Sequence, residues 1–261
     1  MKSIPETSLP AGSIPGGSGP PAPPPVAGLP TAMDPEFDAY AENYDQALQR
    51  GLKVSGEGKE FFAEGRIRWL AVRLSALGYP AGGIMDFGCG TGTSTPWLMG
   101  LPGATKLIGL DVSARSIEVA RRVNSDPRAR FELLSQHRPV GDLTLAFCNG
   151  VFHHIPEPER PGALRYVYDS LRPGGIFAWF ENNPWNPGTR WIMSRIPFDR
   201  EAVTLSPPDA RRRMRAAGFS ILHTDFLFFF PRPLAWLRGL ELALRGIPLG
   251  AQYLVLARKP G

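Results

Sequence analysis

The chain has 261 residues, of which 43% are hydrophobic and 20% charged, and its formal net charge is +5 at pH 7. This composition is that of an ordinary globular protein. Its only cysteines, Cys89 and Cys148, exclude a disulfide framework and a cysteine-based metal site. We expect a soluble cytoplasmic protein, because no signal sequence opens the chain and no apolar run could span a bilayer. The basic run 211–215 is typical of a solvated helix face, so we expect no nucleic-acid partner.

Residues 1–33 are predicted to be a disordered tail. Nine of the chain's 28 prolines fall in the first thirty residues, among Gly, Ser and Ala. Such a segment buries too little apolar surface to offset the entropy of ordering it. From Asp34 on, apolar residues recur at helical spacing and predict a short helix around Tyr40 and Tyr44, then a longer one over 61–77 that ends at Gly78 and Pro80.

Short apolar segments then alternate with helical ones. This alternation predicts a parallel sheet that is covered on both faces and doubly wound, with ligands at the carboxyl ends of its strands. Ser113 fits the N-cap of the second helix of this region. We expect strands at 83–87, 106–110, 130–134, 143–148 and 176–180, and helices at 91–99, 114–123 and 161–171.

After residue 181 the sequence pattern predicts a substrate-side insertion and then a helix over 207–217. It also predicts two closing strands, at 220–229 and 252–257, which are joined by an amphipathic helix over 234–244. The fold class is therefore α/β: a seven-stranded, mostly parallel, Rossmann-like sheet with an antiparallel edge strand and an N-terminal helical lid. The expected domain is 34–261, made of the lid (34–80), the binding core (81–181), the insertion (182–206) and the closing elements (207–261).

Two aromatic stretches of this later region admit several interpretations. Trp185 and Trp191 either border a substrate or pack inward in an ordered cap, and we favour the cap. Phe226–Phe230 with Trp236 could form a wall of a substrate site, a dimer face or plain core, and we favour core. The sequence leaves open whether the chain forms a homodimer.

The stretch Ile84–Gly92 ends the first strand in a turn with glycine at three alternate positions, Gly88, Gly90 and Gly92. Such a turn lets backbone N–H groups approach a ligand closely. In the glycine motif of a dinucleotide site, the third glycine stands one position later, where this chain has Thr93. Asp86, two residues before the turn, suits an ammonium group better than a pyrophosphate.

Asp111 stands at the end of the second predicted strand, nineteen residues past Gly92. A carboxylate at that place can accept both hydroxyls of a ribose. The glycine turn and Asp111 together therefore indicate a nucleoside ligand without a pyrophosphate.

With these features the sequence resembles the class I S-adenosylmethionine-dependent methyltransferases. Asp86–Gly92 and Leu107–Ser113 are similar to the first two motifs of that family, and 148–155 and the 171–175 turn are further matches. The resemblance covers roughly residues 34–180 and the final strand pair. It implies S-adenosylmethionine as the cofactor and leaves the acceptor open.

By this resemblance the three glycines approach the methionine and ribose parts of the cofactor, and Asp86 lies near its methionine end. Asp111 takes the ribose hydroxyls, and an N-terminal tyrosine closes over the methionine carboxylate, with Tyr44 the first choice and Tyr40 the second. The family's acidic contact to adenine is missing after the third strand, where Gln136 or a backbone carbonyl would substitute. The implied cofactor-binding residues are Tyr44, Asp86, Gly88, Gly90, Gly92, Asp111, Val112, Ser113, Asn149 and Gly150.

The histidines His153 and His154 follow the fourth predicted strand. Methyl transfer is a direct displacement, and a base helps only when the nucleophile carries a proton. We therefore expect one of the two to be a catalytic base, with His153 preferred, and we expect no metal site from this pair alone.

The resulting hypothesis is methyl transfer to a small-molecule acceptor, preferably a lipid-like or natural-product intermediate. Two alternatives stay open: a different reaction on the same fold and cofactor, such as aminopropyl transfer or a cyclisation, and a silent scaffold that recruits partners through its proline-rich tail.

Overall fold

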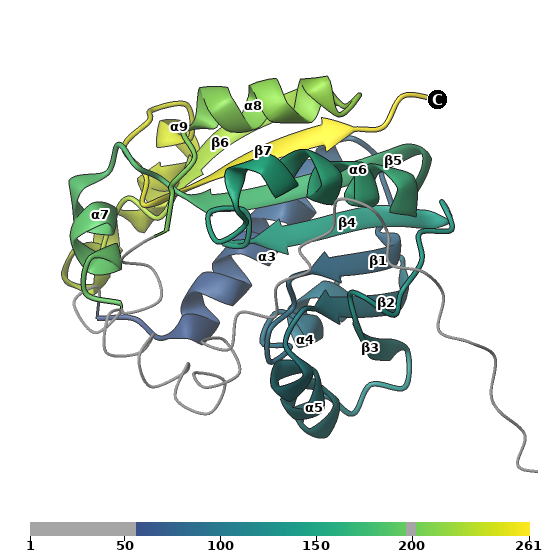
Figure 1. The fold of residues 1–261 in the computed structure, drawn as a ribbon. Coiled ribbons are helices and arrows are strands. Elements are labelled where there is room, and N and C mark those ends of the chain that lie inside the picture. The colour runs from purple at the N-terminus through teal and green to yellow at the C-terminus, as the bar shows by residue number, and fades with distance from the viewer. Residues whose placement is uncertain (1–55, 197–201) are drawn as a thin grey trace, which may run out of the picture.

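The computed structural model describes residues 56–196 and 202–261, which form a seven-stranded sheet with helices on both faces (Figure 1). The strand order is β3-β2-β1-β4-β5-β7-β6, and β7 alone runs in the direction opposite to the other strands. The predicted α/β fold class is confirmed. The strands are β1 (Gly82–Phe87), β2 (Ala104–Asp111), β3 (Ala129–Leu133), β4 (Leu143–Asn149), β5 (Leu171–Asn182), β6 (Ser220–Leu227) and β7 (Gln252–Arg258).

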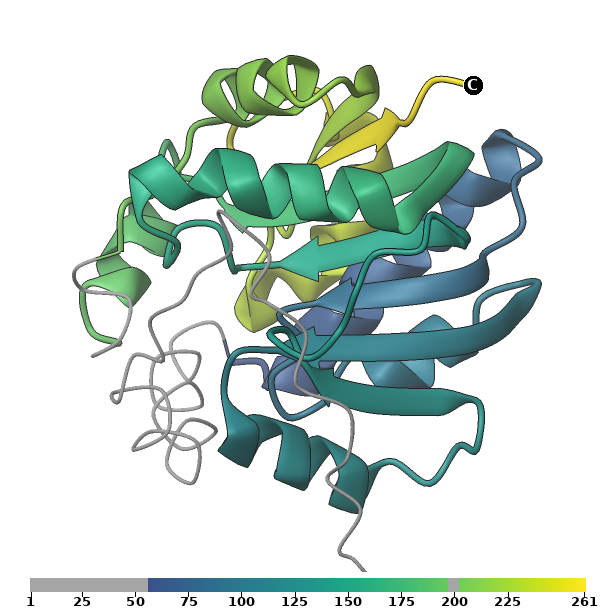
Figure 2. The same cartoon turned by 45° about the vertical axis from the view of Figure 1, so that its right-hand side comes forward.

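The sheet is covered on both faces because its central strands are apolar on both sides; β4, for example, is buried at every residue but its last. Helices α3 (Lys59–Ala76), α4 (Thr95–Met99) and α5 (Ala114–Val123) pack into one buried cluster. Helices α6 (Arg160–Ser170) and α8 (Pro207–Ala216) pack into the other (Figure 2). None of the helices in the described residues is both long and apolar enough to cross a membrane.

The topology determines where ligands bind. β1 lies between β2 and β4, and the chain winds outward from it in both directions. Open α/β sheets bind ligands outside the carboxyl ends of their strands at such a switch point. Because β7 is antiparallel to both β5 and β6, β6 runs in the direction of β5. The strands β1, β2, β4, β5 and β6 therefore all end at the same side of the sheet, which we call the carboxyl edge.

Helix α4 begins later than predicted. The expected helix started at Thr91, whereas α4 runs only from Thr95 to Met99. The reason is the backbone of Gly92, whose φ of 76° is not helical. The Thr95 N–H instead closes a turn onto the Gly92 carbonyl at 3.1 Å, and the helix starts there.

The connection between β6 and β7 differs most from prediction. The expected amphipathic helix is a 3-10 helix, η4 (Arg232–Leu240), with a break at Leu234, followed by the short α9 (Glu241–Leu244). Neither contains a buried residue. The core interpretation holds for Phe226, 7% exposed, and is wrong for Trp236, 78% exposed. Prolines at the start of η4 and Gly239 within it disfavour a regular α-helix.

The insertion after β5 is also more open than expected. It forms α7 (Pro187–Met193), and its Trp185 and Trp191 are 47% and 43% exposed, so inward packing is wrong for both. Each tryptophan contacts one neighbouring side chain and stays partly exposed. Trp185 stacks on Phe226 with ring centroids 6.4 Å apart, and the Arg195 guanidinium lies 3.9 Å from the centroid of Trp191.

Helix α3 is tied to the far strand β6 through one buried carboxylate. Asp225 is 3% exposed and accepts hydrogen bonds from Trp69 Nε1 at 2.9 Å and from Arg73 Nε at 2.6 Å. A second Arg73 nitrogen pairs with its other oxygen, so the contact is bidentate. Removing one partner of such a pair leaves the other charge uncompensated.

We predict that Asp225→Ala lowers the free energy of unfolding by about 3 kcal/mol, because Arg73 and Trp69 lose their acceptor together. Asp142→Ala removes the partner of Lys106 in a pair whose side chains are 47% and 57% exposed, and it should cost about 0.5 kcal/mol. Urea denaturation of both variants measures the difference. Equal losses would contradict the anchoring role of Asp225.

Candidate functional site

The glycine turn after β1 folds back onto the end of β2. The N–H groups of Gly88 and Cys89 both donate to the Leu110 carbonyl, at 2.8 and 3.0 Å. Gly88 has a φ of 73°, and a Cβ there would lie 2.3 Å from Val151 on the loop after β4. A side chain at Gly88 is therefore excluded by both backbone conformation and space.

The structure brings Asp111 to this turn. Its Oδ2 accepts from the Gly90 N–H at 2.8 Å, and its Oδ1 accepts from the Ser113 N–H at 2.9 Å. Ser113 in turn caps α5, since its hydroxyl accepts from the Ser116 N–H at 3.1 Å, as predicted. Both oxygens of Asp111 are thus oriented by backbone donors, and the predicted contact of Asp111 with a ribose stays a prediction.

Asp86 lies beneath the turn and is 2% exposed. Burial, and next the charge of Asp111, raise the pKa of Asp86 to about 7, although Arg66 acts in the opposite direction. Its Oδ2 is buried without a hydrogen-bond partner among the described residues, and so is Oδ1 of Asn149 on the adjacent strand β4. Two unmatched acceptors at neighbouring strand ends fit a ligand group that is rich in donors, such as an ammonium.

The histidine turn after β4 is organised by Glu181, at the end of β5 and 1% exposed. One oxygen of Glu181 accepts from the Phe152 N–H at 3.0 Å and from Trp179 Nε1 at 3.1 Å. The other lies 2.6 Å from Nδ1 of His153. Burial by itself raises the pKa of Glu181, but the charge of His153 and these hydrogen bonds lower it overall, so Glu181 is ionised at neutral pH.

The two histidines have different environments. His153 is 4% exposed, and its ring centroid lies 4.0 Å from that of the less buried His154. Because a carboxylate can only accept, the 2.6 Å contact places the ring proton of neutral His153 on Nδ1 and makes Nε2 its acceptor nitrogen.

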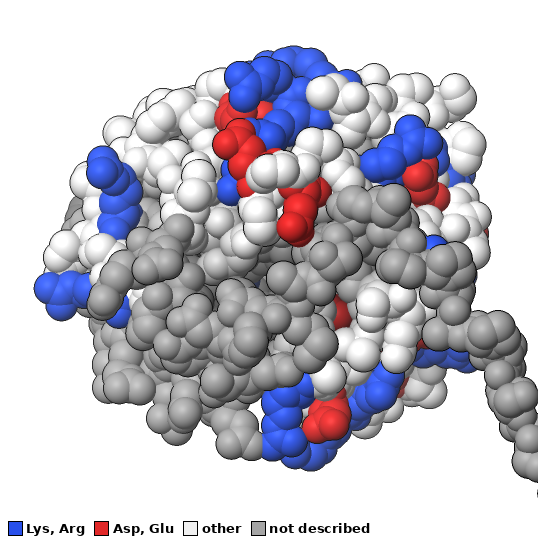
Figure 3. All heavy atoms as spheres, viewed as in Figure 1, with Lys and Arg blue, Asp and Glu red and all other residues white. Residues whose placement is uncertain are grey.

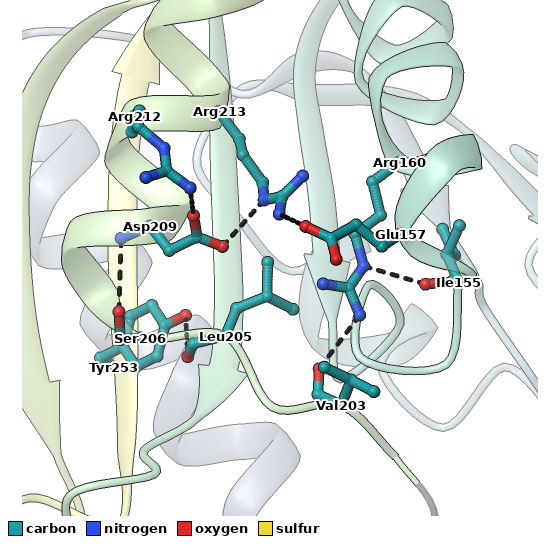
Figure 4. A network of polar contacts seen from close by, with 10 residues as sticks. All are labelled: Ile155, Glu157, Arg160, Val203, Leu205, Ser206, Asp209, Arg212, Arg213 and Tyr253. Atoms are coloured by element: carbon teal, nitrogen blue, oxygen red, sulfur yellow. Dashed lines mark hydrogen bonds and ion pairs between the residues drawn. The ribbon is translucent and has the colours of Figure 1, made fainter.

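A polar network fixes the chain that follows α7 against this turn (Figure 4). Arg160, 2% exposed, donates to the Ile155 carbonyl at 2.9 Å and to the Val203 carbonyl at 3.1 Å. The Val203 N–H donates to the His153 carbonyl at 3.2 Å, and Tyr253 Oη donates to the Leu205 carbonyl at 2.9 Å. The segment entering α8 is thereby held beside His153.

A second arginine extends the same network. Arg213 on α8 contacts Asp209 at 2.8 Å and Glu157 at 2.5 Å, and Glu157 lies in the short 3-10 helix η2 (Glu157–Glu159) between the histidine turn and α6. Arg213 therefore ties α8 to the loop that carries His153 (Figure 4).

The carboxyl edge thus collects the glycine turn, Asp111, Asn149 and the histidine turn. Gly150 also lies there, with a φ of 66° and its N–H bonded to the Phe180 carbonyl at 3.0 Å. Tyr44 and Tyr40 lie outside the described residues, as do the tail and the first lid helix. Among the described residues no group of three His, Cys, Asp or Glu side chains could hold a metal ion.

Sequence reasoning missed two residues of the site. Glu181 had a detectable signal, since an acidic residue at the end of an apolar strand stands where ligands bind. Arg66 had none, because an arginine on a helix is usually solvated. In the structure Arg66 is 7% exposed, lowers the pKa of Asp86 and donates to Gln252 at 3.0 Å.

A family model described as a methyltransferase domain matches residues 84–175, the segment from β1 to the start of β5. The O-methyltransferase cnsE of Penicillium expansum is 28% identical over 213 residues, which cover 77% of this chain and 74% of that protein. A trans-aconitate 2-methyltransferase of Sinorhizobium fredii is 34% identical over 142 residues, 54% of this chain and 49% of that protein.

The chain spans only 27% and 37% of the length of two further curated relatives. Among solved structures, an S-adenosylmethionine-dependent methyltransferase of Thermotoga maritima matches with a TM-score of 0.62 at 20% sequence identity. The match covers 87% of this chain and all 100% of that chain, and at this identity it shows a shared fold.

We predict that the ionisation of Asp86 destabilises the protein. An acid whose pKa is raised by folding contributes stability that is complete below its unfolded pKa of about 4 and is lost as the pH rises. With a folded pKa of about 7, wild type should lose on the order of 4 kcal/mol relative to Asp86→Asn between pH 4 and pH 8. Urea denaturation across this range measures it.

The matched control is Asp126→Asn, at a surface carboxyl whose pKa is lowered by hydrogen bonds from Arg128. A lowered pKa contributes stability that is lost as the pH falls, so any trend here has the opposite sign. Parallel curves for wild type and Asp86→Asn from pH 4 to pH 8 would contradict the raised pKa.

Proposed function

The chain belongs to the class I S-adenosylmethionine-dependent methyltransferase family, and from this premise we propose that it methylates a small-molecule acceptor whose nucleophilic atom carries a proton. Its cofactor is S-adenosylmethionine. The acceptor class is supported by relatives named as an O-methyltransferase and as a trans-aconitate methyltransferase. The observation that carries the proposal is the buried His153–Glu181 pair, which lies at the same sheet edge as the glycine turn and Asp111.

The described residues fit the cofactor. The unmatched oxygens of Asp86 and Asn149 can accept from an ammonium, and the carboxylate of Asp111 can accept from ribose hydroxyls. The turn leaves room at Gly90, since none of the described residues lies within 4 Å of a Cβ placed there. When bound, S-adenosylmethionine supplies an electrophilic methyl group on a positively charged sulfur.

We assign two tasks to the acceptor side. His153 takes the proton of the acceptor nucleophile at Nε2, and Glu181 is a positioning residue that fixes the ring through Nδ1. The ionised Glu181 also stabilises the imidazolium formed by that transfer. The network of Arg160 and Val203 holds the neighbouring segment in place and thereby limits access of water to the base.

Asp111→Asn should weaken binding of S-adenosylmethionine about 10- to 100-fold, because an ionised acceptor of the ribose hydroxyls is lost. Isothermal titration calorimetry on the full chain measures the affinity. Asp126→Asn, on an exposed loop, should leave it unchanged. An unaltered affinity of Asp111→Asn for S-adenosylmethionine would contradict the contact between Asp111 and the ribose.

His153→Gln should lower the rate of methyl transfer about 10²- to 10⁴-fold while the affinity for S-adenosylmethionine stays the same. The assay follows methylated product by mass spectrometry, with trans-aconitate and a panel of phenols, alcohols and amines as acceptors. Glu181→Gln should lower kcat less than His153→Gln and shift the pH dependence of the rate, which a purely structural role would not do. An unchanged rate in His153→Gln would rule out His153 as the base, and cofactor binding without methylation of any acceptor would favour a silent protein.

A further inference from the structure

The carboxyl edge carries an exposed apolar surface that methyl transfer does not explain. We call it the rim: residues 183–196, which include α7, and the β6–β7 connection 228–251. The two parts are joined, because Asn186 Nδ2 donates to the Leu249 carbonyl at 2.6 Å and Asn183 Nδ2 to the Gly250 carbonyl at 2.8 Å. The exposed apolar side chains of the rim are Trp185 (47%), Trp191 (43%), Leu234 (41%), Trp236 (78%), Leu240 (53%), Leu242 (55%), Ile247 (42%) and Leu249 (58%).

The rim is also strongly basic. Its one acidic residue, Glu241, points inward, where its carboxylate accepts from the N–H groups of Phe229 and Phe230 at 3.0 and 3.1 Å. Figure 3 shows blue and no red among the described atoms over the α7 end of the molecule. The cations of the rim are Arg190, Arg195, Arg232, Arg238 and Arg245, of which Arg238 pairs with Glu57.

We propose that the rim docks the protein onto the surface of an anionic lipid membrane. Exposed tryptophan and leucine side chains interleaved with arginine are the composition of elements that lie in a membrane interface, where apolar groups enter the acyl boundary and cations meet anionic headgroups. In the rim, the short helices η4 and α9 contain no buried residue, so their apolar side chains do not pack into the core.

Charge argues against a second copy of the chain as the occupant. A two-fold contact places the same patch on both subunits, so arginines would face arginines with no acidic residue of the rim to compensate. An anionic lipid surface satisfies the same cations. Because β5 and β6 both end at the carboxyl edge, docking through the rim turns the cofactor-binding edge toward the lipid.

The test is flotation of the full chain with vesicles of phosphatidylcholine alone and of phosphatidylcholine mixed equally with phosphatidylglycerol. We expect binding to the mixed vesicles that weakens on raising the salt and that is lost with phosphatidylcholine alone. The double variant Trp236→Ser, Leu240→Ser should lower the vesicle affinity at least about tenfold. Removing one rim cation in Arg245→Gln should lower it about fivefold.

The matched control is Val140→Ser, 73% exposed in the loop before β4, at the opposite edge of the sheet. It should bind vesicles like wild type. All variants should keep the affinity for S-adenosylmethionine, so a failure of the membrane proposal is separate from a failure of the proposed reaction.

Three results would overturn the proposal. The first is absence of binding to mixed vesicles, as expected if another segment of the chain covers the rim. The second is binding that the double variant leaves unchanged. The third is a dimer in light scattering that becomes monomeric in the double variant while wild type does not float, which would make the rim a contact between copies.

Discussion

The site depends on one contact between two strand ends, the hydrogen bond from the Gly90 N–H to the carboxylate of Asp111. It forms because the turn can adopt positive φ angles at Gly88, Gly90 and Gly92, and because the Leu110 carbonyl holds the start of the turn. The same contact keeps Asp111 near Asp86, and this proximity adds to burial in raising the pKa of Asp86. The backbone of the chain itself therefore holds the turn and Asp111 together, as the proposed nucleoside site requires.

A second carboxylate plays the corresponding part between β4 and β5. Glu181 orients the histidine turn through the Phe152 N–H and the His153 imidazole, and it also accepts from the indole N–H of Trp179 on its own strand. His153 and its loop therefore have one common support. The buried guanidinium of Arg160 connects that loop to the chain entering α8. The proposed cofactor and acceptor sites thus lie on neighbouring strands, each fixed by buried polar contacts rather than by flexible surface side chains.

The sequence predicts those features that depend on backbone pattern. The mostly parallel seven-stranded sheet, the Ser113 cap and the approach of the glycine turn to Asp111 follow from apolar periodicity, glycine spacing and the rules for parallel sheets. The bidentate contact of Arg73 with Asp225 and the support of His153 by Glu181 could not be predicted, because they join residues distant in the sequence. Trp236 was misassigned to the core because hydrophobicity alone does not say whether an apolar side chain has a core to enter.

The most direct test of this account is a crystal structure of the full chain with S-adenosylhomocysteine, the demethylated form of the cofactor. We predict the ribose hydroxyls on Asp111 and the ammonium within hydrogen-bonding distance of Asp86 or Asn149, with the turn backbone unchanged. A ligand bound away from the carboxyl edge, or an Asp111 carboxylate that makes no contact with it, would contradict the account.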